Sequence, residues 1–88
     1  MDAVAIDERA LSKLRWRCRR GLLENDLLIE RFFARDTAVS GADERGLYAL
    51  MELADNDLLD LFLGRKKPDA DLDRPEVRQV IEAIRATR

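Results

Sequence analysis

The spacing of apolar residues most constrains the fold of this chain, because it repeats every three or four positions along most of the length. Such spacing places side chains on one face of an α-helix. Its clearest instances are Leu11, Leu14 and Cys18 near one end and the segment 77–84 near the other. β-Branched residues are too sparse and scattered to build strands. We therefore predict an all-α fold, a compact five-helix bundle, in which residues 1–88 form a single helical domain with a flexible N-terminus over residues 1–6.

Capping and turn residues predict the ends of the first three helices. The first helix is expected over about 7–20, ended by Gly21, because glycine commonly follows a helix C-terminus. The second is expected over about 22–35, with Leu23 and Leu27 among its core residues. Ser40 and Asp43 have the spacing of a capping box and precede the third, whose apolar positions run from residue 47 to residue 54.

Capping residues, glycine and proline also predict the bounds of the last two helices. Residues 55–57 offer caps for a fourth helix over 58–63, and Gly64 closes it. A loop over 68–73 follows. Pro75 then stands in the first turn of the final helix, where its missing N–H leaves no hydrogen bond unmade.

The chain has no histidine and a single cysteine, and this excludes several classes of site. A Ser-His-Asp triad and a histidine metal ligand are impossible. Cys18 cannot form an intramolecular disulfide, and its place on the Leu11 and Leu14 stripe predicts burial rather than reactivity. The N-terminal segment is acidic where a targeting peptide is basic, and no apolar run approaches a membrane span. We expect a cytoplasmic bacterial protein without a membrane partner.

Two groups of carboxylates are candidate sites. Asp55, Asp57 and Asp60 suggest acid–base catalysis or a divalent cation, but their place at a helix start is explained more simply by capping and the helix dipole. The alternation of acidic residues over 69–73 resembles a calcium loop only superficially, because the glycine and the glutamate that such a loop needs are both absent. No metal site is predicted, and no catalytic residue.

Charge is distributed unevenly along the chain although the net charge is only −2. Six basic and no acidic residues lie in 9–20, whereas ten acidic and three basic residues lie in 24–60. On a helix, Arg9, Lys13, Trp16 and Arg20 would share one basic face with an aromatic residue in it. This face is compatible with nucleic-acid binding, with protein docking, or with simple solvation.

The string Trp16-Arg17-Cys18-Arg19-Arg20-Gly21-Leu22-Leu23-Glu24 carries a family resemblance. It resembles the signature of the FAD assembly factors of the SdhE/YgfY type. The resemblance continues in Phe32-Phe33, in the segment 55–58 and in Lys67-Pro68. One departure is Leu61, where relatives often have tryptophan.

The resemblance implies a chaperone that is not itself an enzyme. Such factors bind the flavoprotein subunit of succinate dehydrogenase or fumarate reductase and promote covalent attachment of FAD to a client histidine. By the same resemblance, the client would be bound by Arg20, Gly21 and Glu24, and also by Trp16 and Arg19. FAD would be the cofactor of the client, and this chain, which has no Gly-x-Gly-x-x-Gly fingerprint, would bind none tightly. We expect a monomer when free.

Two alternatives belong to other functional classes. A nucleic-acid-binding module would use the basic face of the first helix, against the repulsion of an acidic body. An adaptor bundle would use the apolar segment 58–63 as a partner groove.

Overall fold

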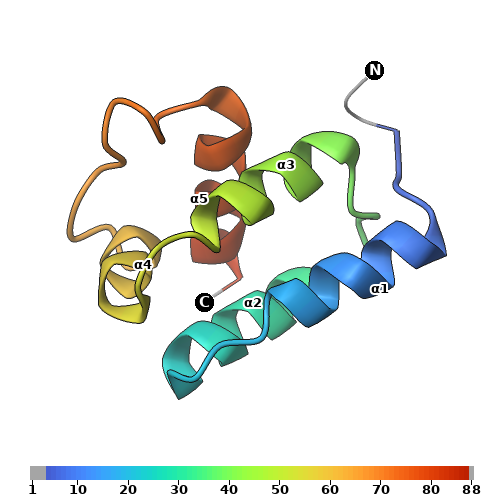
Figure 1. The fold of residues 1–88 in the computed structure, drawn as a ribbon, viewed down its shortest axis with the longest axis horizontal. Helices are drawn as coiled ribbons and strands as arrows, with labels where there is room; N and C mark the ends of the chain where they lie inside the picture. Colours follow the sequence, from blue (N-terminus) through green and yellow to red (C-terminus); the bar gives the residue numbers. More distant parts are fainter. Residues whose placement is uncertain (1–3, 88) are drawn as a thin grey trace.

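Five α-helices make up the regular structure of residues 4–87, which are the residues that the computed structural model describes. They are α1 (Glu8–Arg17), α2 (Leu23–Phe33), α3 (Gly41–Leu50), α4 (Asp55–Phe62) and α5 (Pro75–Ala86) (Figure 1). Within this range there is no strand, only an isolated β-bridge between Ala5 and Ser40. The all-α, five-helix prediction is confirmed.

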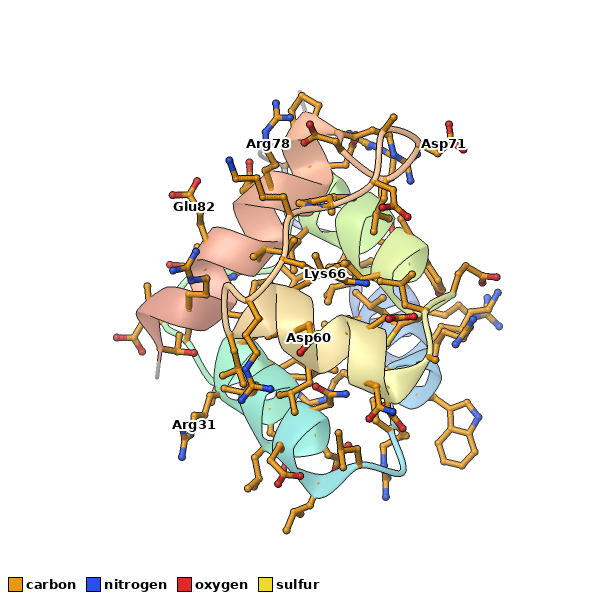
Figure 2. The ribbon with its side chains drawn as sticks, turned by 90° about the vertical axis from the view of Figure 1, so that its left-hand side faces the viewer. Arg31, Asp60, Lys66, Asp71, Arg78 and Glu82 are labelled. Carbon is orange, nitrogen blue, oxygen red and sulfur yellow. The ribbon has the colours of Figure 1, made fainter. Side chains whose placement is uncertain are left out.

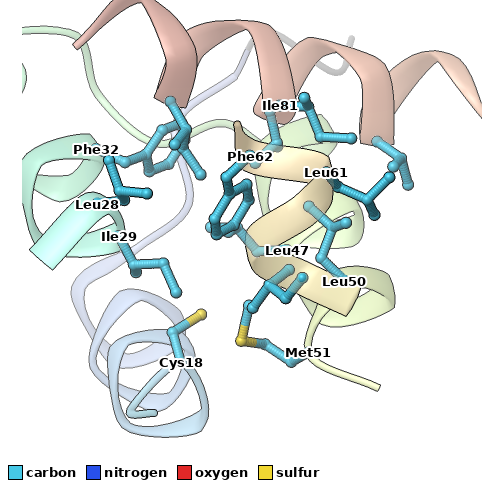
Figure 3. Packing of buried hydrophobic residues seen from close by; sticks show 14 of the residues in the cluster. Cys18, Leu28, Ile29, Phe32, Leu47, Leu50, Met51, Leu61, Phe62 and Ile81 are labelled. Carbon is cyan, nitrogen blue, oxygen red and sulfur yellow. The ribbon is translucent and has the colours of Figure 1, made fainter. Parts of the chain in front are cut away.

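The helices surround one core to which all of them contribute. α3 packs most extensively on α5, α2 contacts α4 and α5, and α1 contacts α3 (Figure 1). Figure 3 shows Phe32 from α2, Leu47 and Leu50 from α3 and Phe62 from α4 converging on this core. The radius of gyration of the Cα atoms, 11.9 Å, is about that expected of a compact domain of this length.

Leu23 and Leu27 were expected in the core, and this prediction is wrong. They are 65% and 46% exposed, whereas Leu28, Ile29 and Phe32 of the same helix are buried. The apolar residues of α2 therefore extend beyond the face of the helix that packs in the core.

The predicted capping features of three helices are confirmed. The hydroxyl of Ser40 accepts a hydrogen bond from the Asp43 N–H, and the Asp43 carboxylate accepts one from the Ser40 N–H. Pro75 is in the first turn of α5. After α4, the Gly64 N–H donates to the Leu61 carbonyl and the next N–H, at residue 65, donates to the carbonyl of residue 60, while Gly64 has a φ of 77°. These are the two hydrogen bonds of a Schellman motif.

Two predicted helix boundaries are wrong. α1 ends at Arg17 with Cys18 as its C-cap, three residues before Gly21, and Gly21 does not have the positive φ of a C-terminal glycine. α4 begins at Asp55 rather than at residue 58, and its N-cap is Ala54, which makes no side-chain cap. The two places are in contact, because the guanidinium of Arg20 binds the carboxylate of Asp55.

Residues 4–6 run beside the segment that enters α3. The Ile6 N–H donates to the Val39 carbonyl, and the Gly41 N–H donates to the Val4 carbonyl. The first three residues of the segment predicted to be flexible lie outside the described residues.

The face formed by α4, α5 and the segment between them is covered with charged side chains. Figure 2 shows Asp60, Lys66, Arg78 and Glu82 pointing outward from it. Lys66 pairs with Asp57 at 3.0 Å. None of the helices described here is long and apolar enough to cross a bilayer.

Candidate functional site

The loop between α1 and α2 holds most of the residues that the sequence singled out. α1 stops where the Cys18 N–H donates to the carbonyls of Leu14 and Arg15. Residues 19–22 are not helical, and the Arg20 N–H donates to Oδ1 of Asp26 at 3.3 Å. The chain therefore turns between the two helices through a short irregular segment whose shape depends on side-chain hydrogen bonds.

Arg20 does not lie on the basic face of α1, which corrects the expected grouping with Arg9, Lys13 and Trp16. Its side chain is 12% exposed and points into the junction of α3 and α4. There Nε donates to Oδ1 of Asp55 at 2.8 Å, Nη1 to the Met51 carbonyl at 3.2 Å, and Nη2 to the Leu53 carbonyl at 2.7 Å. The guanidinium thus supplies hydrogen bonds to carbonyls at the C-terminal end of α3, where a cation is favourable.

Asp55 accepts hydrogen bonds from both sides of this junction. Besides the guanidinium of Arg20, its carboxylate accepts from Nδ2 of Asn25 at 3.0 Å and from the Leu22 N–H at 3.3 Å. The hydrogen bonds from Arg20 and then Asn25 hold the pKa of the Asp55 carboxyl below its ordinary value. Sequence reasoning treated Asp55 as a cap and missed this role, because a partner 35 residues away leaves no periodic signal.

The other predicted site residues face outward. Trp16 is 77% exposed, and Arg19, Gly21 and Glu24 are also exposed. The carboxylate that binds the guanidinium of Arg20 is that of Asp55, and not that of the nearby Glu24. Together with Leu23, these four exposed residues are the candidate docking surface, called the docking surface below: Trp16, Arg19, Gly21, Leu23 and Glu24.

A groove of about 430 Å³ lies between α1 and α2 beside the docking surface. Cys18, Ile29 and Phe33 are among its lining residues, and the guanidinium of Arg15 lies over the Phe33 ring at 5.1 Å. Arg15 and Arg19 line it from the α1 side, and Asp26 and Glu30 line it from α2. The groove thus has both apolar and polar lining residues and carries opposite charges on its two walls.

Cys18 is 2% exposed, as predicted. Burial raises the pKa of its thiol to about 12, although Arg17 and Arg20 act in the opposite direction. The thiol therefore stays protonated at neutral pH and packs as a small apolar group.

The segment 58–63 does not form the partner groove of the adaptor alternative. Leu58, Leu61 and Phe62 are each 2% exposed or less and pack in the protein's own core. Leu61, the departure from the family pattern, is among them, so it changes the core and not a surface. Among residues 4–87 no three His, Cys, Asp or Glu side chains are placed to hold a metal ion.

Comparison with known proteins decides the family. The family model described as flavinator of succinate dehydrogenase matches residues 12–88. The chain belongs to this flavinator family. The resemblance read from the segment 16–24 is confirmed, and the matched region includes the docking surface, Asp55 and all of α2 to α5.

Relatives of this flavinator-family chain are named FAD assembly factor SdhE. The one from Ralstonia nicotianae is 53% identical over 81 residues, covering 91% of this chain and 85% of the relative. The one from Pseudomonas aeruginosa is 35% identical over 80 residues, covering 89% and 94%. The one from Coxiella burnetii is 33% identical over 72 residues, covering 81% and 88%. No solved structure gives a significant match.

Proposed function

We propose that this chain is an assembly factor that binds the flavoprotein subunit of succinate dehydrogenase or fumarate reductase and promotes covalent attachment of FAD to a client histidine. The observation that carries the proposal is the docking surface. It consists of an exposed tryptophan, leucine, glycine, arginine and glutamate where α1 ends and α2 begins. In a chain of the flavinator family, exposed residues of these types are suited to contact with another protein.

Gly21 supports this assignment because the fold itself does not need a glycine there. Its φ is not positive, and the nearest atom to an added Cβ would be Oδ2 of Asp55 at 3.9 Å, an ordinary contact. The packing of this protein therefore does not require a glycine at position 21. A glycine there would instead allow the backbone of a client to come close.

Trp16 and Leu23 would supply apolar contact area, and Arg19 and Glu24 would pair with client charges of opposite sign. Direct contact between Arg20 and the client stays a prediction, because Nε, Nη1 and Nη2 all donate within the chain.

The proposed role is positioning rather than reaction. The chain has no histidine and therefore cannot carry the histidyl-flavin bond itself. The flavin and the client histidine supply the chemistry of attachment. This chain would hold the client surface in the arrangement from which attachment proceeds, which lowers a barrier without a reacting atom.

The lining of the groove between α1 and α2 supports the proposal that FAD is not bound tightly there. Asp26 and Glu30 on one wall oppose the attraction of Arg15 and Arg19 for a pyrophosphate, and glycine is absent from the residues that line the groove. We propose that the chain binds no FAD tightly and acts as a cytoplasmic monomer on the client, without nucleic acid or membrane.

The test is deletion of the gene in its host, followed by in-gel fluorescence of the covalent flavin on the flavoprotein subunit. We expect the fluorescence to fall, to return with the wild-type gene, and to stay low with Gly21→Arg, which places a long cation at the close approach. The matched control is Ala70→Arg, an exposed position beside Asp71, at the opposite end of the molecule from the α1–α2 loop (Figure 2). Undiminished covalent flavin in the deletion strain would refute the proposal.

A further inference from the structure

Arg20 and Leu22 of the α1–α2 loop, which flank Gly21 on either side, both donate hydrogen bonds to the carboxylate of Asp55 at the start of α4. Asn25, at 0% exposure, binds the same residue through both the carboxylate and the backbone carbonyl, at 3.0 and 2.9 Å. Gly21 is therefore held from the residue before it, the residue after it and the first turn of α2.

These contacts replace the regular hydrogen bonds that a loop lacks. Residues 19–22 belong to no helix, and fixing the conformation of such a loop costs conformational entropy. A loop that is already fixed in the free protein does not lose that freedom when a partner binds. A guanidinium bound by one carboxylate and two carbonyls, together with two further donors to that carboxylate, is a rigid arrangement.

We infer that Asp55 is a positioning residue for client docking: with Arg20 and Asn25 it fixes the loop so that Gly21 and Glu24 meet the flavoprotein in one arrangement. Asp55 itself touches no client atom in this scheme. The inference rests on the proposed function, and it assigns part of the docking affinity to a residue outside the docking surface.

The decisive variant is Asp55→Asn, which keeps the size of the side chain but places an amide N–H₂ against one of the donors now bound. Affinity for the purified flavoprotein subunit should fall by about tenfold or more. One control is Asp57→Asn in the same first turn of α4, whose carboxylate binds Lys66 rather than the loop. A second control is Ile84→Val, a core change in α5 at 0% exposure that lowers stability without touching the loop. Both controls should stay within about twofold of wild type.

A second measurement needs no client. Hydrogen exchange of the Leu22 amide in the free protein should speed up in Asp55→Asn relative to amides in the middle of α3, and should be unchanged in Asp57→Asn. Wild-type affinity in Asp55→Asn, or an unchanged Leu22 exchange rate, would overturn the inference. An equal loss of affinity in Ile84→Val would overturn it as well, because docking would then follow stability alone. If wild type itself fails to bind the flavoprotein subunit, the proposed function fails, a result distinct from equal binding by wild type and Asp55→Asn.

Discussion

Gly46 of α3 lies directly against the backbone of Glu76 in α5. A Cβ at position 46 would overlap the Glu76 carbonyl oxygen and come within 2.9 Å of both the Glu76 carbonyl carbon and Cγ2 of Val80. These two helices form the most extensive helix pair of the molecule, so neither backbone can move aside without disturbing the core. We expect Gly46→Ala to lower the free energy of unfolding by about 1–3 kcal/mol, measured by urea denaturation followed by circular dichroism.

Gly41→Ala is the matched control in the same helix. The nearest atom to its added Cβ is Nη1 of Arg45 at 3.6 Å, an ordinary contact with a flexible side chain. Its stability should equal that of wild type or exceed it by up to about 1 kcal/mol, because alanine restricts the unfolded chain. Equal stability of the two alanine variants would contradict the close packing at Gly46.

Alanine should lower the stability of the protein at position 64 but not at position 21. Gly64 has a φ of 77°, so Gly64→Ala forces an L-residue into the left-handed region and should cost about 1–2 kcal/mol of stability. Gly21 has neither a positive φ nor a close neighbour, so Gly21→Ala should leave the unfolding transition unchanged. A large loss of stability in Gly21→Ala would mean that this glycine is structural and would remove one support for the docking surface.

The Arg20 and Asp55 pair predicts how stability depends on pH. The hydrogen bonds from Arg20 and Asn25 lower the pKa of Asp55 in the folded protein, so the stabilisation is fully present above the ordinary carboxyl pKa and is lost as pH falls through the lowered one. Wild type should therefore be more stable than Asp55→Asn at pH 6, and the difference should shrink below about pH 4. Urea unfolding of both proteins at pH 6 and pH 3 measures this. A difference that grows on acidification would contradict the assignment.

Trp16→Ala separates docking from folding. At 77% exposure the indole contributes little to the core, so the free energy of unfolding should change by no more than about 0.5 kcal/mol. Affinity for the flavoprotein subunit should nonetheless fall about tenfold or more, as it does for exposed aromatic anchors of protein interfaces. Calorimetric titration of the subunit with both proteins gives the comparison. Unchanged affinity would remove Trp16 from the docking surface.

Features set by neighbours in the sequence could be predicted. The capping box of Ser40 and Asp43, the closing glycine at position 64 and the buried face of α5 all depend on residues within one or two turns. The family could be read from the segment 16–24 for the same reason: its residues are contiguous.

Features set by distant contacts were predicted wrongly. Helical spacing extended α1 through Arg20, but the chain leaves the helix because the guanidinium binds carbonyls at Met51 and Leu53, more than 30 residues away. Leucine is usually a core residue, and only the placement of the other helices shows that Leu23 and Leu27 are left exposed. In the candidate site, therefore, Trp16, Arg19, Gly21 and Glu24 followed from the motif, whereas the exposure of Leu23 and the contacts of Asp55 and Asn25 required the fold.

The exposure of Trp16 also determines whether tryptophan fluorescence reports on unfolding or on docking. It is the only tryptophan in the chain, and its indole is mostly in water in the folded protein, as it would be in the unfolded one. Its emission is therefore a poor monitor of unfolding, yet it reports directly on any surface that covers the α1 end of the molecule. A fluorescence titration follows docking in wild-type protein without an added label.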